Sequence, residues 1–225
     1  MMKTRLSWML VLVGLAFALV ISGCNDGTKL DPDKEIDILM ELEKPDMYFQ
    51  GAMERFTEGN LTEAAELVDD AITFIDGLQM EGDLRYSEIL DYLETELGQL
   101  RDDVADGNID DVAKLYTTFA SVDRSLATYH LRVVEEFYWL GGDSQEGLER
   151  LTRALIRIDH ASQYQGFELS DEEKDEIQAL KTALKDAERS NPALWKRTSA
   201  IIKKVNKSLK AHREQRIDAE EFQEH

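Results

Sequence analysis

Apolar residues recur at intervals of three and four along most of this chain, and that spacing constrains the fold more than any other feature. One run of them predicts a helix of about 30 residues with a single apolar face, and it comprises Val112, Leu115, Phe119, Val122, Leu126, Tyr129, Val133 and Leu140. No segment alternates apolar and polar residues as a half-buried strand would, and only three prolines are present. The sequence therefore predicts an all-α protein of about seven helices.

Capping residues and helix breakers set the expected boundaries of these helices. Ser170 and Glu173 have the spacing of a capping box, and Asn191 precedes a proline at a first helical position. Pro45 is expected to end the first helix, because the residue before a proline avoids helical geometry. The predicted helices cover 33–42, 46–57, a stretch from 60, 84–105, 108–140, 143–164, 170–190 and 192–217.

Three short turns resemble one another, at 58–60, 106–108 and 141–143. In each of them glycine ends one helix and Asn or Asp caps the next. Over 46–77, and more weakly over 96–160, the chain resembles the tetratricopeptide repeat family. The residues that carry the resemblance are Gly51, Phe56, Gly59, Asn60, Ala64, Val68 and Ala71. The resemblance implies stacked helical hairpins with a surface for a protein partner.

An irregular antiparallel helical bundle is the alternative architecture. The capping residues of the three turns, at 60, 108 and 143, are 48 and 35 residues apart, whereas a regular repeat keeps a fixed period. The segment 112–140 also reads as one continuous helix, as in an elongated bundle. A kink near 121–125 would reconcile the two architectures, and both stay open at this point.

The chain is strongly acidic, with 46 Asp and Glu against 26 Lys and Arg and a formal charge of −20. Nucleic-acid binding needs a positive surface that replaces counterions. We therefore expect no nucleic-acid partner. The single cysteine excludes an intrachain disulfide.

The first 23 residues read as a secretion signal. Lys3 and Arg5 precede an almost continuous apolar stretch at 6–20. As a helix this stretch spans only ~22 Å, which is shorter than the ~30 Å hydrocarbon core of a bilayer. The length favours a signal-peptide core over a permanent membrane span.

An aliphatic residue, two small residues and a cysteine follow this stretch, namely Ile21, Ser22, Gly23 and Cys24. This run resembles the lipobox of bacterial lipoproteins. The resemblance implies cleavage before Cys24, a thioether-linked diacylglycerol on its sulfur, and an N-acyl chain such as palmitate. Two or three acyl chains give stable membrane anchoring. In Gram-negative families an aspartate after the cysteine signals inner-membrane retention; here Asn25 occupies that position, which favours the periplasmic face of the outer membrane.

The expected organisation therefore has four parts. A signal peptide (1–23) is followed by a lipidated tether (24–33), a single all-helical domain (34–217) and a frayed polar tail (218–225). Nine extended residues reach at most ~30 Å. The tether is thus expected to hold the helical body close to the bilayer.

The sequence carries no recognisable catalytic pattern. Only four histidines are present, and none belongs to a His-Glu-x-x-His pair. His130 is interpreted as a buried structural residue, and the neighbours Asp159 and His160 project in different directions on a helix. We therefore expect no enzyme activity, no metal site and no cofactor other than the covalent lipid.

Basic residues gather in one place, because 191–217 hold eight Lys and Arg with Glu214 as the single acidic residue. This helix is predicted either to dock on the acidic body or to contact anionic lipid or an acidic partner through Lys203, Lys204, Lys207 and Lys210. Tyr138, inside the run Phe137, Tyr138 and Trp139, is a further candidate contact.

Together these observations predict a membrane-anchored cell-envelope lipoprotein whose helical body is a protein-interaction or scaffold module. The expected partners are the membrane, reached through the lipid anchor, and another envelope protein or peptide. The alternative is a ligand-capturing accessory lipoprotein of an envelope transport system.

Overall fold

A computed structural model describes residues 32–81, 86–140, 144–187 and 191–223, with side chains described over 44–78, 86–135, 146–187 and 191–214. The predicted signal peptide and Cys24 lie outside the described residues, as does the third turn at 141–143.

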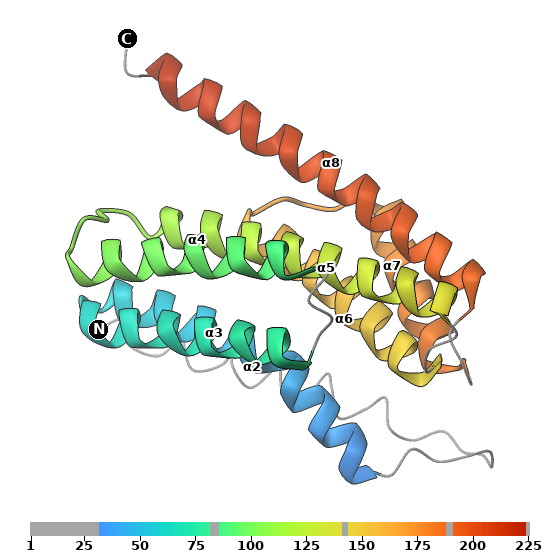
Figure 1. The fold of residues 1–225 in the computed structure, drawn as a ribbon. Coiled ribbons are helices and arrows are strands. Elements are labelled where there is room, and N and C mark those ends of the chain that lie inside the picture. The colour runs from blue at the N-terminus through green and yellow to red at the C-terminus, as the bar shows by residue number, and fades with distance from the viewer. Residues whose placement is uncertain (1–31, 82–85, 141–143, 188–190, 224–225) are drawn as a thin grey trace, which may run out of the picture. The chain divides into compact units, whose positions relative to one another are not determined.

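The described chain consists of seven helices, and no strand occurs among the described residues, so the all-α prediction is confirmed. Consecutive helices pack as neighbours, α3 with α4, α5 with α6 and α7 with α8 (Figure 1). The helices are α2 (Pro32–Thr57), α3 (Leu61–Glu81), α4 (Ser87–Ala105), α5 (Ala113–Leu140), α6 (Ser144–Tyr164), α7 (Asp171–Lys185) and α8 (Pro192–Gln223).

The contacts of the chain define two compact units, 1–41 and 42–225. The first unit is described only over 32–41, the first ten residues of α2. The predicted domain of 34–217 thus starts inside α2, ahead of the boundary at 42. All side chains discussed below belong to the second unit.

The expected break at Pro45 is wrong, because α2 continues through it. A proline inside a helix removes one backbone hydrogen bond and crowds the preceding turn. The Pro45 side chain is buried, as are the neighbouring Asp46 and Phe49. Burial of this turn offsets the cost of the proline. This burial depends on the tertiary packing, so rules based on local sequence cannot predict it.

Other boundaries also differ from the predicted ones. α5 begins at Ala113, five residues after the expected start, because Asp111 and not Asn108 caps it: the Ala113 N–H donates to Asp111 Oδ1 at 2.9 Å. α8 continues to Gln223, past the predicted end at 217. The capping box at Ser170 is confirmed, with the Ser170 hydroxyl and the Glu173 carboxylate each accepting the other residue's backbone N–H.

Glycine forms the first two predicted turns as expected. Gly59 and Gly107 have φ of 81° and 68°, a left-handed conformation that costs glycine little. The N–H of the following residue bonds back to the ending helix, from Asn60 to the Arg55 carbonyl at 2.9 Å and from Asn108 to the Asp103 carbonyl at 2.8 Å. These bonds satisfy carbonyls that the helix end leaves unpaired.

Two hydrophobic clusters fill the interior, and α5 contributes to both of them. One cluster combines α2, α3 and α4 with one face of α5, including Phe119, Leu126 and Tyr129. The other combines α6, α7 and α8 with a second face of α5, which carries Ala127, Leu131 and Val134. The 28-residue α5 is continuous, so the kink considered near 121–125 does not interrupt it.

Candidate functional site

The predicted contact residues fall into two groups. Cys24 lies outside the described residues, and Tyr138 lies in α5 at a position where side chains are not described. Lys203, Lys204, Lys207 and Lys210 all lie on α8 and are exposed.

The structure separates these lysines by what they contact. Lys204 Nζ lies 3.1 Å from Glu172 Oε2 of α7, and Arg197 forms a two-pronged pair with Glu176 at 3.1 and 3.2 Å. These two basic residues thus contact α7, and the pairs are exposed to solvent. Lys203, Lys207 and Lys210 do not face α7: by helical geometry they share the side of α8 opposite its buried residues.

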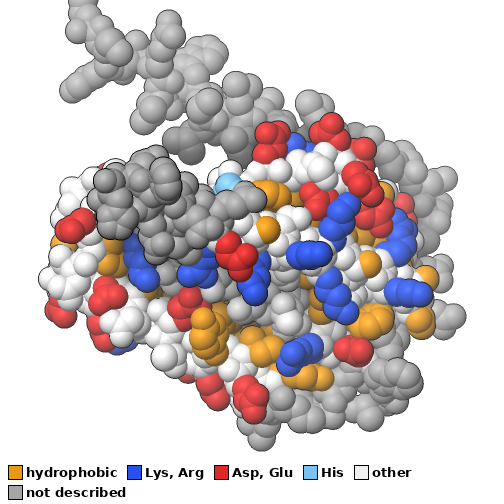
Figure 2. Space-filling view, turned by 90° about the horizontal axis from the view of Figure 1, so that it is seen from above, with side chains coloured by type: hydrophobic (Ala, Val, Ile, Leu, Met, Phe, Trp, Pro, Cys, Tyr) orange, Lys and Arg blue, Asp and Glu red, His pale blue; other side chains and the backbone are white. Residues whose placement is uncertain are grey.

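Figure 2 looks onto the molecule from the side where α8 lies uppermost in Figure 1. Lys and Arg side chains spread over much of this face, with apolar and acidic side chains among them. Along α8 itself, 192–213 contains Lys and Arg but no Asp or Glu, in contrast to the whole chain with its formal charge of −20.

A buried cluster of charged groups joins α2, α5 and α6, and the sequence did not reveal it. Arg157 Nη1 donates to Asp46 Oδ2 at 3.0 Å and to Asp123 Oδ1 at 3.1 Å. The side chains of Arg157, Asp46 and Asp123 are only 3%, 9% and 0% exposed. His160 Nδ1 lies 2.9 Å from Asp46 Oδ1, and the Tyr164 hydroxyl donates to the same oxygen at 3.5 Å.

Burial and mutual attraction shift the protonation of this cluster. Burial raises the pKa of Asp123 to about 7, even though Arg157 acts in the opposite direction, and Asp46 adds to the rise. Burial lowers the pKa of His160, but its contact with Asp46 and the charge of Asp123 outweigh that effect and leave the pKa raised. Burial, with Asp123 and Asp46 next, also raises the pKa of Tyr164. Asp123, His160 and Tyr164 thus all have a pKa above the value that each would have in water.

Asp46, Asp123 and His160 also offer a donor set that could hold a metal ion, with one ligand atom from each lying within 4.8 Å of the others. Asp123 Oδ2 is buried and has no hydrogen-bond partner. However, the Arg157 guanidinium already bridges the two carboxylates and supplies a positive charge between them. A cation entering the site would meet that charge, so we interpret the group as an ion-pair cluster that joins three helices.

Aromatic rings cover one side of this cluster. Phe49 and Phe119 stack with centroids 4.2 Å apart, and the Tyr164 ring meets each of them edge-on at 6.2 Å. The Tyr116 ring lies 6.4 Å from Tyr164 and is 39% exposed. The cluster therefore has an apolar wall that reaches the surface at Tyr116.

His130 has the structural character that its position predicted. It is 3% exposed, and its pKa is lowered by burial and by the nearby Arg150, Arg153 and Arg157. Asp159 and His160 do not form a dyad, because Asp159 pairs with Lys181 of α7 at 3.0 Å whereas His160 turns toward Asp46.

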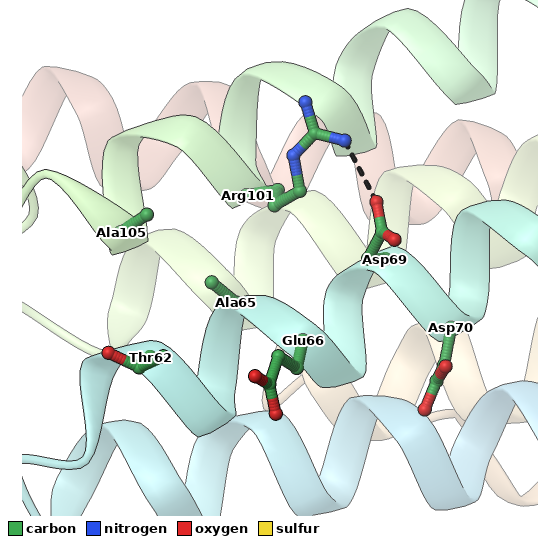
Figure 3. A pocket seen from close by; sticks show the side chains of 7 residues that line it. All are labelled: Thr62, Ala65, Glu66, Asp69, Asp70, Arg101 and Ala105. Atoms are coloured by element: carbon green, nitrogen blue, oxygen red, sulfur yellow. Dashed lines mark hydrogen bonds and ion pairs between the residues drawn. The ribbon is translucent and has the colours of Figure 1, made fainter.

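A shallow depression of about 560 Å³ lies between α3 and α4. Arg101 reaches from α4 toward Asp69 on α3, and the two side chains pair at 2.8 Å (Figure 3). The other lining residues are Thr62, Ala65, Glu66, Asp70 and Ala105. The depression is open, and its lining combines three carboxylates and Arg101 with small side chains.

Comparisons with known protein families, curated proteins and solved structures found no match for this chain.

Proposed function

We propose that the chain is a membrane-anchored lipoprotein of a bacterial cell envelope, and that its helical body is a protein-interaction or scaffold module without enzymatic activity. The anchor is inferred from Ile21, Ser22, Gly23 and Cys24 after the apolar stretch 6–20. The covalent lipid on Cys24 would hold the protein at the membrane, with the outer membrane favoured in a Gram-negative cell.

Among the described residues, none of the helices combines the length and the apolar character needed to cross a bilayer.

The proposal that the body is a module without enzymatic activity rests on how its buried ionisable groups are bonded. Asp46, Asp123 and Arg157 have side chains less than one tenth exposed, and Arg157 bonds to both aspartates, which links three helices. A general acid or base has to reach the proton of its substrate, and these three side chains are too buried to do so; His160, whose side chain is 28% exposed, connects the cluster to the surface. The geometry of the cluster supports a role in fixing the helical framework.

The exposed apolar residues supply candidate contacts for a partner protein. Met47, Tyr92 and Tyr116 are 64%, 56% and 39% exposed. Tyrosine and methionine are enriched in protein interfaces, where they offer a large contact area. Tyr92 lies on α4 and Tyr116 on α5, so the two tyrosines are candidate contacts on different helices of the module.

A photocrosslinking experiment in intact cells tests this proposal. A photoreactive phenylalanine analogue replaces Tyr92 or Tyr116 in turn, and the control places it at exposed Thr182 on α7. We expect a discrete adduct with an envelope protein from at least one tyrosine position and none from Thr182. Absence of an adduct at both positions, across growth conditions, would contradict the module.

The anchor is tested separately with Cys24→Ala. The substituted chain should lose signal processing and lipid labelling while its helical content stays unchanged. Incorporation of radiolabelled palmitate, measured for both proteins, gives the readout. A fully processed Cys24→Ala protein that remains in the membrane fraction would contradict the anchor.

The alternative proposal, a ligand-capturing accessory lipoprotein, requires an enclosed and mainly apolar pocket. The depression between α3 and α4 is open and carries three carboxylates, Glu66, Asp69 and Asp70. This depression therefore does not by itself support ligand capture, and the exposed tyrosines lead us to favour the interaction module.

A further inference from the structure

Four exposed lysines form a single row along the outward side of α8. Lys196, Lys203, Lys207 and Lys210 follow one another at intervals of seven, four and three residues. At 100° per residue these positions fall within an arc of about 60°, and at 1.5 Å per residue the row is about 21 Å long. We call these four residues the lysine row.

The lysine row is not needed to hold α8 in place. The opposite side of α8 packs into the second hydrophobic cluster through Leu194, Ile201, Ile202, Val205 and Leu209. The ion pairs with α7 come from Arg197 and Lys204, which lie to one side of the row. Within the described part of the chain, the ion pair found for the row is Lys210 with Glu214, a solvent-exposed contact at 3.9 Å.

Along α8 the stretch 192–213, which holds the row, contains no Asp or Glu, and the first acidic residue is Glu214, one turn beyond Lys210. Two neighbouring outward positions are small and exposed, Ala200 within the row and Ala193 just before it. The row therefore presents positive charge without large apolar or aromatic side chains on the same side of the helix. Protein interfaces have the opposite composition, because they are rich in aromatic residues and depleted in lysine.

We propose that the lysine row binds the anionic headgroups of the bilayer and so sets which face of the body lies on the membrane. This inference deepens the proposed function, because it relies on the lipid anchor to keep the body near the surface. Lipid phosphates diffuse in the plane and can collect under a fixed line of lysines, which a rigid protein partner cannot do. The rest of the chain is acidic, so repulsion from the same headgroups turns its other faces away.

The expected strength follows from the number of lysines. Each lysine near an anionic surface raises binding about fivefold, so four raise it by several hundredfold. A lipid anchor makes this an intramolecular event, for which the effective concentration is high. The attraction is screened within about one Debye length, so it weakens as salt rises.

The test uses the mature lipidated protein reconstituted into vesicles. An Ala200→Cys substitution places a fluorophore inside the lysine row, and Cys24 does not compete for the label because its sulfur carries the lipid. Quencher lipids report proximity to the headgroups, in phosphatidylcholine vesicles and in vesicles with about one phosphatidylglycerol in three lipids. We expect strong quenching in the anionic vesicles and weak quenching in the neutral ones.

Substitution of all four lysines of the row by glutamine should lower the quenching in anionic vesicles to the level seen in neutral vesicles. The matched control changes four other exposed lysines to glutamine, Lys44, Lys114, Lys174 and Lys185, and should keep the quenching. A version with arginine throughout the row should also keep it, because the charge is retained. Circular dichroism confirms that each variant is folded.

Equal quenching in the two kinds of vesicle, or quenching that survives glutamine in the row, would overturn the proposal. Failure of the anchor gives a different result, because an unlipidated protein does not incorporate into vesicles at all. A protein that incorporates normally but shows no headgroup contact at Ala200 leaves the anchor intact and overturns only the orienting role.

Discussion

Replacement of Arg157 by methionine tests the interpretation that the buried charged cluster holds three helices together. Methionine keeps the length and much of the volume of the side chain but removes the two hydrogen bonds to Asp46 and Asp123. Removing one partner of a buried ion pair costs about 3–5 kcal/mol, because the remaining charge stays buried without compensation. Here two carboxylates lose the same cation, so we expect the upper part of that range near pH 8.

The loss should be smaller at lower pH. Burial raises the pKa of Asp123 to about 7, so near pH 5 this side chain is largely neutral with or without Arg157 and loses little when the arginine is removed. Urea unfolding followed by circular dichroism gives the free energy of unfolding at each pH. The Arg157→Met variant should therefore be destabilised more at pH 8 than at pH 5.

Two comparisons make this prediction specific. Arg101→Met removes an arginine that pairs at 2.8 Å with Asp69, but these side chains are 38% and 57% exposed, so its cost should stay within about 1 kcal/mol. Combining Arg157→Met with Asp123→Asn should cost less than the sum of the two single changes, because the double variant no longer buries the Asp123 charge. A cost below about 1 kcal/mol for Arg157→Met, or strict additivity in the double variant, would refute the reasoning.

Three further predictions follow from single side chains. Asp123→Asn should make the free energy of unfolding less dependent on pH. Burial raises the pKa of Asp123 in the folded state, so its protonated form stabilises the fold below about pH 4. This contribution, on the order of a few kcal/mol, is lost as the pH rises through 7. Urea titrations from pH 4 to 8 should show the wild type losing more than the variant, and parallel curves would contradict this. Phe49→Ala, which removes a ring stacked at 4.2 Å on Phe119, should cost about 3–5 kcal/mol in the same assay; a loss under ~1 kcal/mol would mean that the ring is not packed as described. Ser170→Ala removes the capping box of α7 and should cost about 1 kcal/mol, visible as a lower thermal midpoint, whereas an unchanged midpoint would argue against the cap.

The helices were predictable from sequence because their signals are local. The apolar face of α5 from Leu115 to Val133 was found by spacing alone, and the same residues line the first hydrophobic cluster. The caps at Ser170 and Asn191 were found in the same way, since a cap needs only the few residues beside it. The second buried face of α5, at Ala127, Leu131 and Val134, has the same spacing of four and three residues, and it was missed because one apolar face had already been assigned to this helix.

The charged cluster was not predictable because its residues are distant in the chain. Asp46 and Arg157 are 111 positions apart, and Asp123 and Arg157 are 34 apart. Carboxylates are abundant in this chain, so no local spacing distinguishes these two from the rest. The lysines of α8 were partly predictable. The basic character of α8 was evident from composition, but only its packing on α7 shows that Lys204 contacts α7 while the lysine row faces outward.

The position of α5 between the two hydrophobic clusters limits how the protein can be truncated or redesigned. Leu126 faces one cluster, and Ala127, the next residue, faces the other, so no point along this stretch belongs to one half alone. A fragment that ends before α5 leaves the apolar faces of α3 and α4 without the helix that completes their core, and a fragment that starts after it does the same to α6 and α8. The two clusters therefore share one folding unit, and the shortest autonomous piece of this body has to contain the whole of α5 together with helices from both sides.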